Sequence, residues 1–190
     1  FEESPNGAPL TSGKVAIKNR SIGEIGFSYM GGIYNTFEKD GVTLDDKRRL
    51  NVYAVDINTT IPGIKTYIVG ELAYISLDIS ESYTQSYGDR QFGFFTDIVQ
   101  PIWQNEILNW KNATLNIAAR IDYIDWNLGT FNETGQDIGD QLWAITPAIS
   151  FRPSSQTVLR INYRYQWQSD LINNPATQTA SWLFGFSTYF

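Results

Sequence analysis

The chain of 190 residues contains no cysteine and no histidine. Their absence excludes disulfides, thiol nucleophiles, imidazole bases and metal sites built from Cys or His ligands. Most familiar hydrolase mechanisms depend on one of these groups. The sequence therefore predicts that the protein is not an enzyme and that it uses no cofactor and no metal ion.

Long apolar runs and an excess of positive charge are also missing. No stretch approaches the roughly 18 consecutive apolar residues of a membrane-spanning helix. The 14 basic residues are outnumbered by 20 acidic ones, which argues against a nucleic-acid partner. The opening FEESPNGAPL has neither the basic start nor the apolar core of a signal peptide, so we expect a mature form or a piece of a longer protein.

What is present is a period of two in hydrophobicity, which is typical of β-strands with two different faces. The run at 157–168 is the clearest, because Leu159 and Ile161 alternate with Arg160 and Asn162 and the pattern continues beyond them. Pro101 and Pro147 interrupt two runs, where a missing amide donor favours an edge or a bulge. Eight runs are expected, at 22–34, 48–60, 65–78, 90–103, 113–126, 140–152, 157–168 and 180–190.

The connections between the runs alternate in length, with one medium connection, QNEILNWKN, after the fourth run. Bacterial outer-membrane barrels have long loops outside the cell and short turns on the periplasmic side. The modest mean hydropathy of −0.27 fits such strands, since only their outward residues meet lipid. The pattern predicts a transmembrane β-barrel with a periplasmic C-terminus.

Several segments in order resemble the C-terminal half of the phosphate-selective porins, including their relatives in Bacteroidota: GEIGFSYMGGIY, GELAY at 70–74, ARIDYID at 119–125, and ISFRPSSQTVLRINYRYQWQ leading to the terminal Phe190. The resemblance implies a barrel of about 16–18 strands, of which this chain would supply about half. It also implies a Gram-negative source. The basic phosphate-binding ladder of that family has no counterpart that can be matched residue by residue here.

The predicted fold is therefore all-β, an antiparallel up-and-down transmembrane β-barrel with about eight strands in this chain, either complete or part of a 16–18-stranded barrel. Residues 1–190 form one domain or the C-terminal part of one. Residues 1–21 are expected to be a loop with a partial strand around Lys14–Lys18, which would make nine strands, and 22–190 to hold the eight strands. Bacterial single-chain barrels normally have an even number of strands.

If the apolar faces meet lipid, the opposite faces line the lumen, where charged side chains can select ions. An alternative is that these charges pair with one another and stabilise a filled barrel. The Asp40–Asp46 loop carries three carboxylates, but a solvated acidic loop is favoured there over a calcium site. The residues predicted to set selectivity are Arg120, Arg152, Arg160, Arg164, Glu71 and Asp122.

Aromatic side chains near strand ends favour a position at the membrane interface, although carbohydrate stacking would use the same residues. Trp143, Trp167, Trp182 and Phe190 are predicted to be such interface aromatics. The last strand also ends in an aromatic residue, which resembles the signal by which outer-membrane barrels are recognised for assembly. Phe186 and Phe190 would carry that signal.

The leading functional hypothesis is an outer-membrane porin for passive diffusion of small solutes, with the lumen arginines favouring anions. One alternative is a non-conducting small barrel that acts as an anchor or accessory subunit of an envelope complex. A second is a soluble lipocalin-like binding protein with its aromatic face inside. The expected partners are the lipid bilayer, lipopolysaccharide, the barrel assembly machinery, and either further copies of the chain or an envelope complex.

Overall fold

The computed structural model describes residues 8–21 and 23–189. Within them the chain is all β-strand and turn, and no helix capable of crossing a membrane is present in this described part. Two short strands, β3 (Glu38–Lys39) and β4 (Val42–Thr43), form a small hairpin. The main strands are β1 (Thr11–Asn19), β2 (Gly23–Ile33), β5 (Arg49–Ile61), β6 (Thr66–Leu77), β7 (Arg90–Ile107), β8 (Trp110–Asp125), β9 (Gln141–Ser154), β10 (Thr157–Gln168) and β11 (Thr177–Thr188).

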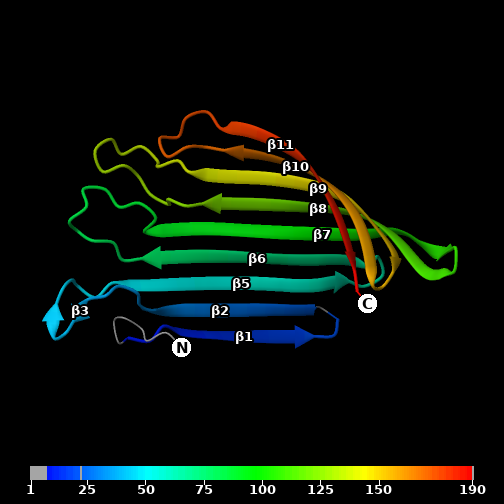
Figure 1. The fold of residues 1–190 in the computed structure, drawn as a ribbon, viewed down its shortest axis with the longest axis horizontal. Coiled ribbons are helices and arrows are strands. Elements are labelled where there is room, and N and C mark those ends of the chain that lie inside the picture. Colours follow the sequence, from blue (N-terminus) through cyan, green and yellow to red (C-terminus); the bar gives the residue numbers. More distant parts are fainter. Residues whose placement is uncertain (1–7, 22, 190) are drawn as a thin grey trace.

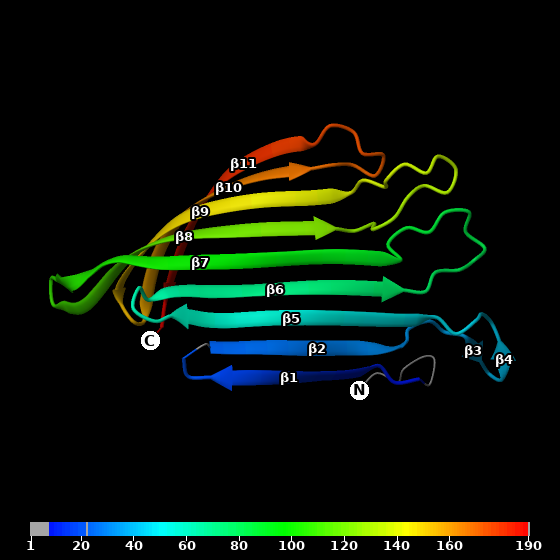
Figure 2. The ribbon, with the colours of Figure 1, turned by 180° about the vertical axis from the view of Figure 1, so that it is seen from behind.

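These main strands form one antiparallel sheet of nine strands in the order β1-β2-β5-β6-β7-β8-β9-β10-β11. Each strand therefore pairs with the next main strand in the chain, an up-and-down arrangement. Figures 1 and 2 show a single layer that curves most strongly through β9, β10 and β11, with no second layer against either face. Among the described residues β1 and β11 are not paired with each other, so the sheet has two open edges.

The eight predicted runs are confirmed as strands β2 and β5 to β11, with small shifts of their boundaries. The partial strand expected near Lys14 is a complete strand, since β1 spans nine residues and pairs with β2 along its whole length. The expectation of about eight strands is thus corrected to nine. The sequence signal was weak there because Thr11, Ser12 and Gly13 precede the alternating part.

The connections alternate strictly between long and short. Long loops at 34–48, 78–89, 126–140 and 169–176 lie at one end of the sheet, on the left in Figure 1, and the short turns lie at the other end with the C-terminus. The medium connection predicted after the fourth run was wrong. Most of QNEILNWKN belongs to β7 and β8, which protrude as a hairpin and turn at Leu108 and Asn109. Polar side chains on both sides of this protrusion hide the period of two.

The two prolines sit inside interior strands. In β7 the pairing with β8 shifts by one residue between Pro101 and Trp103, which is the bulge expected at a residue without an amide donor. In β9, Pro147 pairs with Ala119 of β8, but the ladder to β10 is interrupted beside it. Both prolines are therefore accommodated by local breaks in one ladder, and neither strand is moved to an edge.

The register sorts the side chains onto two faces. One face carries an unbroken cross-strand row of aromatic residues near the long-loop end, called here the aromatic row. It starts with Tyr29 opposite Tyr53 and continues through every following strand to β10. Ring centroids within it lie as close as 4.5 Å, between Tyr123 and Trp143. The aromatic row consists of Tyr29, Tyr53, Tyr74, Phe92, Phe94, Tyr123, Trp143 and Trp167.

A second row crosses the same face near the short turns, called here the short-turn row. On β9 the two rows are separated by the eight residue steps from Trp143 to Phe151, which is about 27 Å along a strand. Isoleucine, leucine, valine and phenylalanine fill most of the space between them, and many are exposed. The short-turn row consists of Trp103, Leu115, Phe151, Leu159 and Phe186.

The apolar face has no cover within the described chain. In the whole described chain the only buried hydrophobic residues are Ala113, Ala144 and Ile138, of which Ala144 lies on the polar face and Ile138 in a loop, and no large side chain is fully buried. By contrast Phe184 is 76% exposed and Phe186 is 68% exposed. A sheet normally buries its hydrophobic face against another layer. This sheet must therefore meet an apolar environment outside itself.

The β7–β8 turn contains a strained residue that offers a stability test. Leu108 and Asn109 both have positive φ (46° and 69°), as in a type I′ turn, for which Asn-Gly is the favoured sequence. The Leu108 side chain is 82% exposed, so its replacement removes almost no packing contact. We expect the double variant Leu108→Asn, Asn109→Gly to raise the free energy of unfolding by about 1 kcal/mol. Urea unfolding of the protein in lipid vesicles measures it.

Gly63→Ala is the control with the opposite sign. Gly63 lies in the β5–β6 turn with a φ of 89°, and a Cβ there would meet no atom within 4 Å. The penalty is then purely conformational, and we expect a loss of about 1 kcal/mol. A double variant at the β7–β8 turn that destabilises the protein would contradict the turn geometry described here.

Candidate functional site

The face opposite the aromatic row carries most of the charged side chains of the sheet. Every charged residue predicted to line a lumen lies on this polar face, because each occupies a position that alternates with the aromatic row along its own strand. The polar face carries Lys14, Lys18, Glu24, Asp56, Glu71, Asp97, Arg120, Asp122, Arg152, Arg160 and Arg164.

The centre of this face is a network of two arginines and two aspartates on β7, β8 and β10. Asp122 accepts hydrogen bonds from Arg120 Nε at 2.7 Å and from an Arg164 terminal nitrogen at 2.8 Å. Arg120 also reaches Asp97 at 3.2 Å. The guanidinium of Arg120 lies 4.2 Å from the ring centroid of Phe95. Two of the predicted selectivity arginines are thus largely neutralised by carboxylates.

A second ion pair spans three strands near the β1 edge. Lys14 Nζ donates to Asp56 at 2.9 Å, and the two side chains pass across β2 at Gly26. A Cβ at Gly26 would lie 2.3 Å from an Asp56 oxygen, so glycine makes the crossing fit. Glu71 lies directly opposite Asp56 on the next strand and belongs to this acidic region, apart from the arginine network.

The polar face is segregated by charge. Carboxylates lie on β2, β5, β6 and β7, whereas arginines lie on β8, β9 and β10 with Asp122 among them. Like charges placed opposite each other on neighbouring strands are destabilising, as with Asp56 and Glu71. Such a pair is tolerated most easily where water screens the charges. The polar face therefore has an acidic half, in which Lys14 of the edge strand pairs with Asp56, and a basic half.

Arg152 and Arg160 differ from the other two arginines. Both are exposed, and among the described residues neither forms an ion pair with a carboxylate. They border a cavity of about 490 Å³ on the polar face, which Arg120 and Arg164 also line. Arg160 lies across Gly185 of β11, where a Cβ would come within 2.7 Å of its Nε. The predicted arginine set is brought together here, but only two of its four charges lack a carboxylate.

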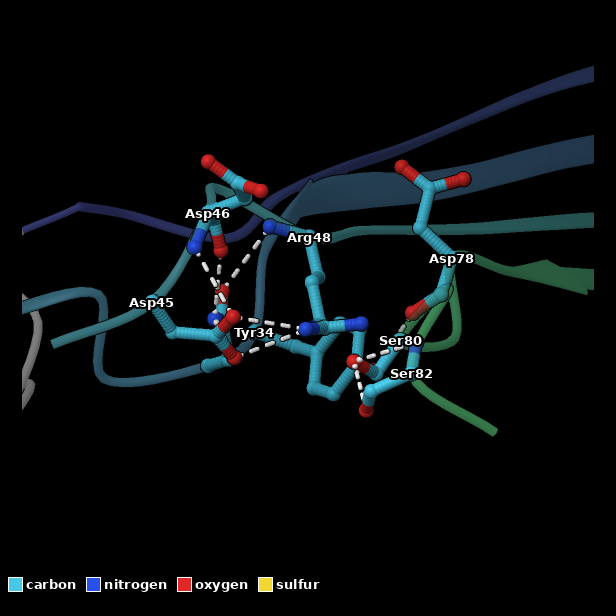
Figure 3. A network of polar contacts seen from close by, with 8 residues as sticks. Tyr34, Asp45, Asp46, Arg48, Asp78, Ser80 and Ser82 are labelled. Carbon is cyan, nitrogen blue, oxygen red and sulfur yellow. Dashed lines mark hydrogen bonds and ion pairs between the residues drawn. The ribbon is translucent and has the colours of Figure 1, made fainter. Parts of the chain in front are cut away.

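The long-loop end contains a separate polar network, shown in Figure 3. Arg48 donates to both oxygens of Asp45, at 2.8 and 2.6 Å. Tyr34 donates its hydroxyl proton to the backbone oxygen of Asp78 at 2.7 Å, and so links two loops. The hydrogen bonds from Arg48 lower the pKa of Asp45 to about 2. Asp45 of the acidic loop is therefore engaged by an arginine and stays ionised at neutral pH.

The predicted interface aromatics fall in different places. Trp143 and Trp167 face each other in the aromatic row. Trp182 lies in the middle of β11 beside Tyr163, with ring centroids 4.9 Å apart, because β11 begins three residues earlier than predicted. Phe186 is on the apolar face in the short-turn row, and Phe190 lies outside the described residues.

Sequence reasoning missed the aromatic row as a continuous feature. Its members are scattered from residue 29 to residue 167 and include tyrosines and phenylalanines that no local pattern singles out. The available signal was the position of each aromatic, within a few residues of a long loop on its own strand. Only the register shows that these positions lie at one level across seven strands.

The arginine network predicts unequal effects for its two aspartates. The Asp122 side chain is 12% exposed and holds two arginines, whereas Asp97 is 33% exposed and holds one of them more loosely. We expect Asp122→Asn to lower the free energy of unfolding by about 1–3 kcal/mol. Asp97→Asn should cost less than about 1 kcal/mol, since Arg120 keeps Asp122. Urea unfolding measures both, and equal effects would contradict the network.

Comparison of the chain with protein-family models, with curated proteins and with solved structures finds no match. The resemblance to phosphate-selective porins therefore stays a prediction. The features that bear on function are those of the described residues: an apolar face with an aromatic row, a charged opposite face, and alternating long and short connections.

Proposed function

We propose that this chain forms part of the wall of an outer-membrane β-barrel whose polar face lines a water-filled path for small solutes. The observation that carries the proposal is the bare apolar face, bounded at one end by an aromatic row that continues across seven strands. Membrane barrels carry an outward apolar band flanked by aromatic girdles at both interfaces. A soluble single-layered sheet has no use for such a face.

The spacing of the two rows supports a lipid environment. The separation of about 27 Å along β9 shortens to about 20 Å if the strand is tilted by roughly 40°, and the side chains of both rows reach further. The apolar band of bacterial membrane barrels is about 25 Å tall. The two lengths agree to within the size of one aromatic ring.

The strand count bears on how such a wall closes. Neighbours in the sheet are antiparallel throughout, so β1 and β11, the first and last of nine, run in the same direction. Closing β11 directly onto β1 would require a parallel pair, whereas an odd number of further strands would keep every pair antiparallel. We infer a larger barrel in which these nine strands are one portion, in line with the 16–18 strands that the porin resemblance implies.

A second candidate function is a non-conducting anchor or accessory subunit of an envelope complex. The network of Arg120, Arg164, Asp97 and Asp122 favours it, since paired charges stabilise a filled interior as well as they line a pore. The exposed arginines Arg152 and Arg160 favour passage of solutes, because charges left without a partner need water or a mobile ion. We rank the pore first on that ground.

Cysteine labelling tests which face meets lipid, because the chain has no cysteine of its own. Ala54 and Val55 are neighbours in the middle of β5 and lie on the polar and apolar faces respectively. In native membranes we expect Ala54→Cys to react with a water-soluble thiol reagent and Val55→Cys to be protected. In the bare sheet Val55 is the more exposed of the two, at 38%, so lipid would reverse the order.

Denaturation in detergent-free urea gives the control, since both cysteines must then react at the same rate. Rapid labelling of Val55→Cys in membranes with protection of Ala54→Cys would mean that the apolar face is wet and the polar face enclosed. That result would overturn the membrane orientation.

Conductance tests the pore itself. The native barrel reconstituted in a planar bilayer should conduct ions. In a potassium chloride gradient, the reversal potential of the Arg160→Glu variant should shift toward cation selectivity, because a charge in the lumen has changed sign. Arg20→Glu makes the same charge change in the exposed β1–β2 turn and should shift it less, because water and salt screen it there. A native barrel that inserts but carries no current would leave the anchor as the better proposal.

A further inference from the structure

We propose that the cavity beside Arg152 and Arg160 binds small organic carboxylates that carry an apolar body. This inference rests on the proposed function for its place in a lumen, but the binding chemistry comes from the cavity itself. The cavity measures about 490 Å³, and its lining residues lie toward the short-turn end of the polar face. Its lining combines arginine side chains with apolar side chains.

The first part of the lining consists of arginine side chains, of which Arg152 and Arg160 form no ion pair with a described carboxylate. Arg120 and Arg164 donate hydrogen bonds to Asp97, Asp122 and Gln166. Among the described residues no carboxylate pairs with Arg152 or with Arg160. A guanidinium presents a planar fork of N–H donors that matches a carboxylate. These two side chains are therefore the part of the cavity that is ready to accept an anion.

A hydroxyl stands between the two arginines. Ser150 lies directly opposite Arg160 on β9 and two residues from Arg152, so all three project from the same face. Ser150 Oγ accepts a hydrogen bond from Asn116 Nδ2 at 3.2 Å, which leaves the hydroxyl proton free to donate. The arginine end of the cavity thus offers a third donor suited to a carboxylate oxygen.

The second lining is apolar. Apolar side chains from six strands, β6 to β11, contribute to it, and all of them lie on the polar face by register. An inorganic anion would keep its water and gain nothing from this surface, whereas a hydrocarbon body gains free energy in proportion to the apolar area it covers. The larger apolar side chains of this lining are Tyr67, Val69, Val99, Val158 and Leu183, and Ala118 and Ala148 also contribute.

Glycine at position 185 fixes where Arg160 lies. The Arg160 side chain rests on β11 at Gly185, and an added Cβ would lie 2.7 Å from Nε and 2.9 Å from Cγ. Gly185→Ala therefore displaces the guanidinium while keeping its charge. Gly13→Ala is the matched control, because a Cβ at Gly13 of β1 would meet no atom within 4 Å.

The test is calorimetric titration of the purified native barrel with benzoate, acetate and inorganic phosphate as probes. We expect benzoate to bind more tightly than either of the others. Arg160→Gln and Arg152→Gln should each weaken benzoate about tenfold or more, through loss of a charge-assisted hydrogen bond. Gly185→Ala should weaken it as well, whereas Gly13→Ala and Arg20→Gln should leave it unchanged.

Val99→Thr separates the apolar contribution from the charge. The two side chains have nearly the same shape, but the hydroxyl makes the cavity wall polar. We expect benzoate to bind more weakly in this variant while acetate is unaffected. Phosphate or acetate binding as tightly as benzoate, or benzoate affinity unchanged in Arg160→Gln, would overturn the inference.

Conductance recorded on the same preparation keeps the two proposals distinguishable. Current without benzoate binding would refute the carboxylate site and leave the pore standing. Benzoate binding that depends on Arg160, in a barrel that carries no current, would refute passive passage and establish a binding site in a closed barrel. Binding together with partial block of chloride current by benzoate would support both.

Discussion

The structure depends on the backbone ladder of one continuous antiparallel sheet. Nine strands satisfy one another's amide and carbonyl groups in sequence order, and no second layer or helix of the described chain helps to hold them. A single layer has two faces and two edges, and each of them must be satisfied by its surroundings. The chemistry of the side chains tells what those surroundings are, because the pleat assigns alternate residues to opposite faces.

The apolar face and the polar face are stable in different environments. The apolar face presents exposed aliphatic side chains between the aromatic row and the short-turn row. Contact between so large an apolar surface and water is unfavourable. The polar face presents arginines and carboxylates, of which some are paired and others are left to water. In the barrel wall proposed above, lipid on one side and an aqueous path on the other would satisfy both faces at once.

The period of two predicted most of the fold because strand existence and face membership are local properties. Leu159 and Arg160 already belong to opposite faces in the sequence, and the structure keeps them there. Ion pairs such as Lys14 with Asp56 cross 42 positions of sequence and could not be predicted, because they depend on the register and on Gly26 between them. For the same reason the sequence predicted the four arginines as one group. Only the contacts separate Arg120 and Arg164, which are paired, from Arg152 and Arg160.

In the barrel proposed above, further strands would join the two open edges of the sheet. β1 and β11 run in the same direction, so the acidic and basic halves of the polar face can come to face each other only across strands that this sheet does not contain. The number and curvature of those strands would set the distance between the two halves. At less than about one Debye length the carboxylates would weaken the positive potential of Arg152 and Arg160, and at larger distances they would have little effect on it. In the proposed barrel the charge left available to a passing solute would therefore depend on how the barrel closes, although the residues that carry it lie on this sheet.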